Sequence, residues 1–226
     1  MGGSTLVSEI VEGPLTLVES MERDEELLRA GRLAVRVARL ANPALSLGAG
    51  QRDTEGLEDR ARELGVPTHR RPSGGLGLLL LPGDILWSVM VPPTVVGPSP
   101  TRSYGRFGAG VIDFLEQYRV GAAWVDAWGL SPSYCLLGPR GQVLARHDKA
   151  FGGAAQHLTR SGLLHHGVLI ARRREAMLGP LFGLTEELLA SRLTSLDELG
   201  IPYDDARTPA RLVRALGAAL RRSVDR

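Results

Sequence analysis

The chain has 226 residues, of which 43% are apolar and 23% charged, and its formal net charge is +2. This length and composition predict a single soluble globular domain over residues 1–226 rather than a disordered or fibrous chain. The near-neutral charge argues against a nucleic-acid partner, and no apolar run is long enough to span a membrane. Cys135 is the single cysteine, which excludes an intramolecular disulfide. With no recognisable secretory leader, we expect a cytoplasmic location.

Hydrophobic periodicity predicts alternating strands and helices through the first half of the chain. Strands carry apolar residues at alternate positions, whereas helices repeat them every three to four residues. We expect strands over residues 14–18, 32–37 and 85–91, helices over 21–29 (capped by Ser20) and 54–64, a glycine-rich turn over 42–51, and a surface loop over 92–103.

The second half is predicted to hold several short strands and to end in a long helix. We expect helices over 110–118, 186–196 and 208–224, strands over 121–125, 134–137, 142–145 and 163–171, and a glycine-rich loop over 150–156. The last helix starts with Thr208 and Pro209, an N-cap followed by proline at the first helical position. Its apolar stripe predicts that it packs on the body of the domain.

The segment RRPSGG, residues 70–75, is the first candidate binding site. Its glycines let a ligand approach bare backbone amides, and Arg70 and Arg71 can hold a phosphate or carboxylate through forked hydrogen bonds. Taken alone, such a string is more often a polar loop between a helix and a strand.

A second candidate site combines FGGAAQ, residues 151–156, with the adjacent His165 and His166. On a strand the two histidines would point to opposite faces, so that one of them can face a ligand. Alone, such a pair is more often structural, and without an acidic or cysteine cluster we expect no metal site. Cys135 lies in an apolar string, where a cysteine is usually a small buried hydrophobe.

Four segments in order resemble one enzyme superfamily. They are MERDEELL, PALSLGAGQ, RRPSGG followed by PGDILWSV, and FGGAAQHLTRSGLLHHGVLI. Over about residues 17–200 they resemble the lipoate–protein ligase, octanoyltransferase and biotin–protein ligase superfamily, and most closely its lipoate–protein ligase A type. The resemblance implies an α/β (α+β) fold, with a mixed sheet flanked by helices as in class II synthetase catalytic domains.

The resemblance implies acyl transfer to a carrier protein in two steps. Lipoate or octanoate would be activated by ATP with Mg²⁺ to an acyl-adenylate, and the acyl group would then pass to a lysine of a lipoyl-acceptor domain. The expected acceptors are those of 2-oxoacid dehydrogenases or a glycine cleavage H-type protein, and an accessory ligase subunit is a further expected partner. Such chemistry requires neutralised negative charge and exclusion of water.

The resemblance also implies roles for particular residues. Lys149, the only lysine of the chain, would be catalytic. Arg71 would hold carboxylate and phosphate, with Arg70 in support. The other expected binding residues are Ser73, Gly74, Gly75, Gly152, Gly153, Ala155 and His166.

Departures from the family pattern leave the activity open. Ala150 occupies the family's lysine position, one residue after Lys149, and a bulge at this point would restore Lys149 to the site. Leu76, Leu80 and Leu81 stand where the family has a glycine and a His-Asp pair, which makes the pocket more apolar.

Two alternatives to the ligase stay open at this point. The first is a transferase that moves octanoyl or lipoyl groups between carrier proteins without ATP, in which Cys135 could serve as the acyl-thioester nucleophile. The second is a diverged, non-catalytic protein that binds an acyl group or a partner. A requirement for ATP separates the ligase from the transferase, and lipoate binding without turnover would indicate the non-catalytic protein.

Overall fold

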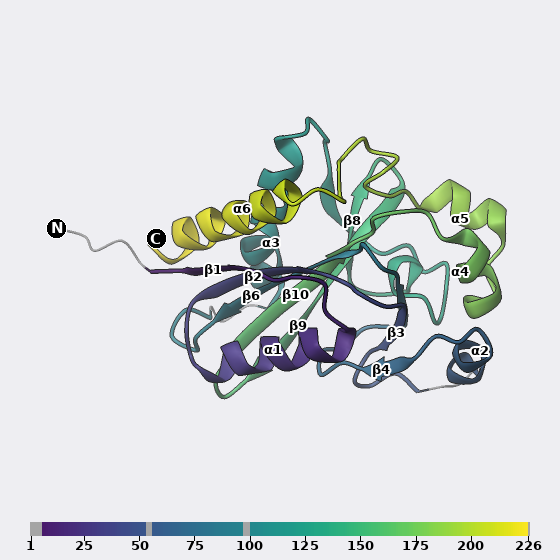
Figure 1. The fold of residues 1–226 in the computed structure, drawn as a ribbon, viewed down its shortest axis with the longest axis horizontal. Coiled ribbons are helices and arrows are strands. Elements are labelled where there is room, and N and C mark those ends of the chain that lie inside the picture. Colours follow the sequence, from purple (N-terminus) through teal and green to yellow (C-terminus); the bar gives the residue numbers. More distant parts are fainter. Residues whose placement is uncertain (1–5, 53–55, 97–99, 226) are drawn as a thin grey trace.

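The computed structural model describes residues 6–52, 56–96 and 100–225 of the chain. These residues contain ten strands in two sheets, six α-helices and one 3₁₀ turn. The larger sheet has seven strands in the order β1-β2-β6-β10-β9-β8-β7, and the smaller one has the order β4-β3-β5. The β1–β2 and β3–β4 pairs are parallel and the others antiparallel. Helices on both faces of this mixed sheet confirm the predicted fold class (Figure 1).

The elements have the following bounds. The strands of the larger sheet are β1 (Ser8–Val11), β2 (Ala34–Arg39), β6 (Ile85–Val91), β7 (Ala123–Asp126), β8 (Gln142–Arg146), β9 (Lys149–Thr159) and β10 (Gly162–Leu169). Those of the smaller sheet are β3 (Ala44–Leu47), β4 (Thr68–Arg70) and β5 (Leu78–Leu80). The helices are α1 (Leu17–Arg29), α2 (Leu57–Glu63), α3 (Pro100–Glu116), α4 (Glu175–Phe182), α5 (Glu186–Arg192) and α6 (Arg207–Val224), and the 3₁₀ turn is η1 (Cys135–Leu137).

Helix α1 begins four residues earlier than predicted, so the strand expected over 14–18 is wrong. Thr16 caps the helix, because its hydroxyl accepts from the Glu19 amide while the Glu19 carboxylate accepts from the Thr16 amide. Ser20, the predicted cap, has Arg23 rather than an acid three residues later and cannot form this box. The strand of this region lies upstream, as β1.

Residues 150–156, predicted as a glycine-rich loop, lie in β9 instead. The glycines serve close packing rather than a turn. A Cβ on Gly152 would lie 2.7 Å from the Val168 carbonyl oxygen, and one on Gly153 would lie 2.9 Å from the Leu136 side chain. The composition that predicts a loop is therefore the one that lets this strand pack tightly against its neighbours.

Two further predictions are corrected by the structure. Residues 100–103 of the loop predicted at 92–103 belong to helix α3, since proline is compatible with the first turn of a helix. Residues 134–137, predicted as a strand, instead contain the turn η1. Helix α4 was not predicted, because Gly179 and Pro180 interrupt its pattern. Residues 54–55 and 97–99 of the predicted elements lie outside the described chain.

Helix α6 confirms the predicted amphipathic C-terminal helix. Its buried stripe includes Leu212, Val213, Leu216 and Leu220. The N-cap is Ala206 rather than Thr208, whose buried hydroxyl donates to a backbone carbonyl upstream. Within the described residues, no helix combines the length and apolarity that crossing a membrane requires.

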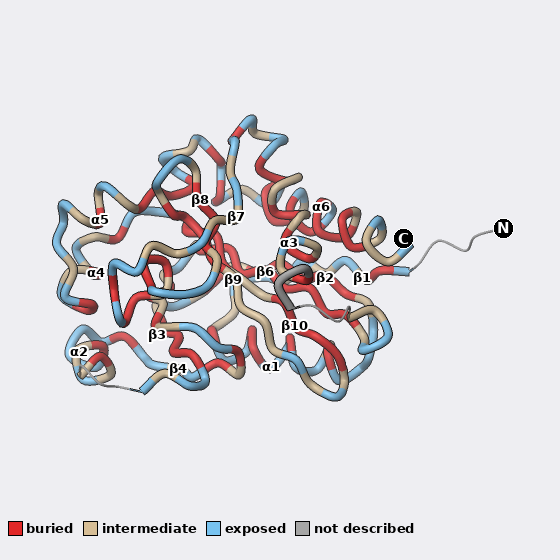
Figure 2. The backbone as a smooth tube through the Cα atoms, turned by 180° about the vertical axis from the view of Figure 1, so that it is seen from behind, coloured by how far each residue is buried: buried red, intermediate tan, exposed pale blue. Residues whose placement is uncertain are grey.

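The two faces of the larger sheet are covered differently. Helices α3 and α6 lie on one face, and α1 and the smaller sheet lie on the other (Figure 1). The α3/α6 face is filled by a continuous apolar cluster that includes Trp87, Phe107, Phe114 and Phe151. In Figure 2 the central strands are buried along most of their length. The face beneath α1 holds a second apolar cluster together with buried polar side chains, and there the pocket described below is found.

Candidate active site

A pocket of ≈ 590 Å³, its open mouth included, lies between α1, the smaller sheet, η1 and strands β6, β10 and β9. Most of its wall is apolar, and the apolar side chains are Leu17, Met21, Leu78, Leu80, Leu86, Trp87, Leu136, Ala154, Ala155 and Val168. A few polar side chains interrupt this wall: Ser20, Asp24, Ser46, Arg71, Cys135 and His166. An apolar pocket with a few polar groups suits an elongated apolar molecule that carries one charged end.

The strand register decides which side chains reach this pocket. Arg36, Ser88, His166 and Ala155 lie opposite one another on four adjacent strands, so they form one row across the sheet. Because side chains alternate along a strand, this row faces α1, while His165 points to the α3 side. The expectation that the two histidines point to opposite faces is confirmed.

Arg71 is a buried cation that lines the pocket. Its Nη1 donates to the Ser46 carbonyl oxygen at 3.0 Å, and its Nη2 donates to those of Gly74 and Leu76 at 2.8 and 2.9 Å. Among the described residues no carboxylate lies within ion-pair distance of it. Burial lowers the pKa of Arg71. An anion brought by a ligand would therefore supply the counter-charge that the protein does not.

His166 meets the RRPSGG loop across the pocket. Its Nε2 lies 2.7 Å from the Ser73 hydroxyl, so the hydrogen bond joins β10 to the loop that carries Arg71. Burial lowers the pKa of His166 to about 3, and the Arg71 charge acts in the same direction. The ring is therefore neutral at pH 7 and can exchange hydrogen bonds with a ligand without adding charge.

Two glycines bring backbone segments into close contact beside Arg71. A Cβ on Gly48 would lie 2.0 Å from the Gly75 carbonyl oxygen, so only glycine fits there. Gly75 has φ +100°, and a Cβ on it would lie 2.6 Å from Arg71 Nη2 and 3.6 Å from Cys135 Sγ. The thiol and the guanidinium therefore border the same point of the pocket. Cys135 is half-buried at the pocket wall rather than enclosed in the core.

The structure brings together most of the predicted site residues. Arg71, Gly153, Ala155, His166 and Cys135 line the pocket. The buried hydroxyl of Ser73 bonds His166, and Gly75 lies against Arg71.

Other predicted residues lie away from the pocket. Arg70 donates to the Gly48 and Gln51 carbonyl oxygens and pairs with Glu58, so it fastens the neighbouring loop. Gly74 is exposed. Gly152 packs against the opposite face of the sheet, as described above.

Lys149 does not line the pocket in this structure. Its Nζ donates to the Ala190 carbonyl oxygen of α5 at 2.7 Å. A bulge lies close by, because Leu144 pairs with Gly152 while Ala145 pairs with Ala150. A bulge at this point was expected to restore Lys149 to the site, but with the bulge present the amine still lies against α5.

The buried polar groups on α1 were missed by sequence reasoning. Ser20 and Asp24 lie on the same helical stripe as Leu17, Met21 and Leu28, and all are buried. Two polar residues on an otherwise apolar stripe could have marked a site from the sequence alone.

Residues 17–214 match the family of the lipoyl protein ligase A/B catalytic domain. The chain therefore belongs to this family. The matched region ends about fourteen residues beyond the C-terminal limit expected from the motifs. No curated protein sequence matches the chain.

Three solved structures illustrate the likeness in fold. A lipoate–protein ligase A bound with ATP is 18% identical, with a TM-score of 0.76, covering 95% of this chain and 86% of that one. An archaeal bi-partite lipoate protein ligase from Thermoplasma acidophilum, described with its E2 lipoyl domain, is 16% identical, with a TM-score of 0.72 over 95% and 84%. A biotin protein ligase from Aquifex aeolicus in complex with biotin and ATP is 14% identical, with a TM-score of 0.52 over 98% and 72%. At these identities the likeness establishes the fold.

Proposed function

We propose that the chain is a lipoate–protein ligase-like enzyme, which activates lipoate with ATP and transfers the lipoyl group to a lysine of a lipoyl-acceptor domain. The observation that carries this proposal is Arg71, a buried guanidinium at the wall of an apolar pocket, for which the described part of the chain supplies no carboxylate partner. A carboxylic acid with an apolar chain supplies both the missing anion and the matching apolar surface. The family and the lipoate and biotin ligase neighbours support the same class of substrate.

The residues of this pocket would act mainly by binding and by excluding water. Arg71 would hold the carboxylate and keep negative charge close to it, while the leucine walls shield the reacting carbon. His166 and Ser73 would position the acid through neutral hydrogen bonds. ATP would supply the adenylyl group that converts the carboxylate into a mixed anhydride with release of pyrophosphate, and the acceptor amine would then displace AMP from the acyl carbon. Arg71 is the only positively charged side chain in the described pocket wall, so phosphate binding would need a further cation.

Lys149 is the candidate for that further cation. It is the only lysine of the chain, and the bulge in β9 lies next to it. Release of its hydrogen bond to the Ala190 carbonyl would free the amine to move. No group of three or more His, Cys, Asp or Glu residues in the described chain could hold a metal ion, so we propose that Mg²⁺ arrives with ATP.

The acceptor is proposed by analogy with the family. One neighbouring ligase is described with its E2 lipoyl domain and is bi-partite. We therefore propose a lipoyl domain of a 2-oxoacid dehydrogenase, or a glycine cleavage H-type protein, as the acceptor. A separate accessory subunit is a further candidate partner.

The mass of a purified lipoyl-acceptor domain tests this proposal. The domain is incubated with the protein, lipoate and Mg²⁺, with and without ATP, and with Lys149→Ala and the exposed control Arg140→Ala. A lipoyl gain that needs ATP, disappears in Lys149→Ala and persists in the control supports the ligase. No gain, including with an octanoyl carrier as donor, would exclude both enzymatic activities for the isolated chain.

Cys135 favours a second candidate, an acyltransferase that does not use ATP. Its thiol borders the pocket next to Arg71 rather than lying enclosed in the core. The Cys135 sulfur would attack the thioester carbonyl of an acyl carrier, releasing the carrier thiol and leaving the acyl group on Cys135. The acceptor amine would then displace the Cys135 thiol. A hydroxylamine-labile octanoyl gain on the protein, absent in Cys135→Ala, would support this candidate.

A further inference from the structure

Helix α1 turns two polar side chains toward the pocket. Leu17, Ser20, Met21 and Asp24 recur at helical spacing on its buried side, and all four line the pocket. Asp24 is only 4% exposed. A carboxylate this deeply buried needs a specific reason, because burial of charge is unfavourable unless the charge is paired and hydrogen-bonded.

Among the residues that the structure describes, one of the two carboxylate oxygens of Asp24 accepts hydrogen bonds and the other does not. Oδ1 accepts from Arg36 Nε at 2.8 Å and from the Ser88 hydroxyl at 2.6 Å. Oδ2 accepts no hydrogen bond from the residues that the structure describes, although Asp24 lines the pocket. The charge of Asp24 is balanced by Arg36, while one acceptor oxygen is left for whatever fills the pocket.

The pocket leads from Arg71 to Asp24 by way of His166. Ser88, which bonds Asp24, lies opposite His166 in the strand register, and His166 bonds Ser73 in the loop that carries Arg71. An acid held by Arg71 would therefore direct its chain past His166 toward α1. A plain alkyl chain there would expel water from Oδ2 without replacing its hydrogen bond, which is unfavourable.

We propose that Asp24 makes this pocket selective for acids whose chain carries a hydrogen-bond donor. A hydroxylated or dithiol medium-chain acid would bind more tightly than the plain alkanoate or the cyclic disulfide, which have no donor on the chain. This inference rests on the proposed function only in taking the pocket as the acyl site. It changes that function in one respect, because it names a hydroxylated or dithiol acid, rather than lipoate itself, as the acid that the pocket binds more tightly, and it names Asp24 as the residue that selects it.

Calorimetric titration of the whole chain tests the proposal with four acids: octanoate, ω-hydroxyoctanoate, lipoate and dihydrolipoate. The titration is run near pH 8, because burial raises the pKa of Asp24 and the carboxylate must be charged. We expect each donor-bearing acid to bind about tenfold more tightly than its partner without a donor. Equal affinities within each pair, measured on the unaltered protein, would overturn the proposal whether or not any variant folds.

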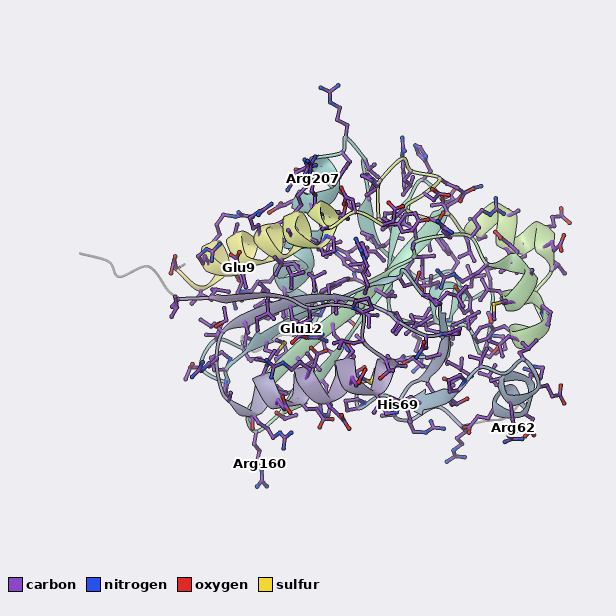
Figure 3. All side chains as sticks on the ribbon, viewed as in Figure 1. Glu9, Glu12, Arg62, His69, Arg160 and Arg207 are labelled. Atoms are coloured by element: carbon purple, nitrogen blue, oxygen red, sulfur yellow. The ribbon has the colours of Figure 1, made fainter. Side chains whose placement is uncertain are left out.

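Two variants then assign the selectivity to Asp24. Asp24→Asn keeps an oxygen for Arg36 and Ser88 but replaces the free oxygen with an amide donor. Glu12→Gln is the matched control, because Glu12 pairs with the same Arg36 at 3.0 Å and lies outside the pocket wall, between the sheet and α1 (Figure 3). We expect the tenfold ratio to disappear in Asp24→Asn and to persist in Glu12→Gln.

The remaining outcomes separate this inference from the proposed function. If no acid binds at all, both the proposed acyl site and the proposed selectivity are wrong. If all four acids bind equally, only the selectivity fails. AMP is titrated into the same variants. If Asp24→Asn loses affinity for AMP while the affinity ratio between donor-bearing and plain acids is unchanged, the free oxygen binds a nucleotide hydroxyl and the proposal is overturned.

Discussion

The two faces of the larger sheet differ in whether their buried polar groups have hydrogen-bond partners, and one pair of residues illustrates the difference. His165 and His166 are neighbours on β10. His165 lies beneath α3 against Trp87 and Tyr104, and neither ring nitrogen has a partner among the described residues. His166 lines the pocket and bonds Ser73. One face is closed and stabilises the fold, whereas the other is partly open and carries the site.

The largest effect is expected on the closed face. Phe114 is fully buried between α3 and the sheet. Phe114→Ala should lower the free energy of unfolding by about 4 kcal/mol, since a large cavity opens in a packed cluster. Urea denaturation measures this, with exposed Leu158→Ala as the control. If the two faces are as distinct as we infer, lipoate affinity of the folded fraction stays unchanged, and a large loss of affinity would contradict the division.

The next largest effect is expected on the open face. Arg71→Ala removes the pocket cation and its bonds to three backbone carbonyls. We expect acid affinity to fall at least about a hundredfold, which corresponds to about 3 kcal/mol. Arg71→Lys keeps the charge and loses the fork, so it should recover only part of the binding. Calorimetry decides, and an unchanged affinity in Arg71→Ala would remove the basis of the carboxylate site.

Acid should destabilise the closed face through His165. Burial lowers the pKa of His165 from 6.5 to about 3. Between these values the unfolded chain binds a proton that the folded chain does not, so stability falls as the pH drops below 6.5. Lowering the pH from 7 to about 5 should reduce the free energy of unfolding by about 2 kcal/mol through this residue alone. His165→Leu should remove that share in urea titrations at the two pH values, and an identical pH dependence in the variant would show that His165 is not responsible.

The smallest effect is expected at the hydrogen bond that joins the two sides of the site. Ser73→Ala removes the partner of His166 Nε2. Because a neutral hydrogen bond contributes about 1 kcal/mol and this one also positions the acid, we expect acid affinity to fall about fivefold and the melting temperature to fall by about 2–4 °C. Ser133→Ala is the matched control, since its buried hydroxyl has no partner among the described residues. A fall of the same size in the control would show that the loss is not specific to this bond.

Sequence periodicity predicted the strongest elements and failed where glycine and proline have more than one use. The apolar runs at 85–91 and 163–171 formed the central strands β6 and β10 as expected. FGGAAQ was predicted as a loop, yet its glycines allow β9 to pack closely. Helix α4 was missed for a related reason, because Pro180 lies inside it.

By itself the sequence determined the family, the mixed sheet with helices on both faces, and the two motifs that bring Arg71, on a loop, and His166, on a strand, to the site. Those properties follow from local sequence patterns, which can be recognised without knowing which segments pack together. The tertiary structure alone decided that Arg70 fastens a loop while Arg71 lines the pocket, and that Asp24 faces the pocket. The tertiary structure also decided that Lys149 lies against α5. In each case the contacts of a side chain depend on elements that are distant in the sequence.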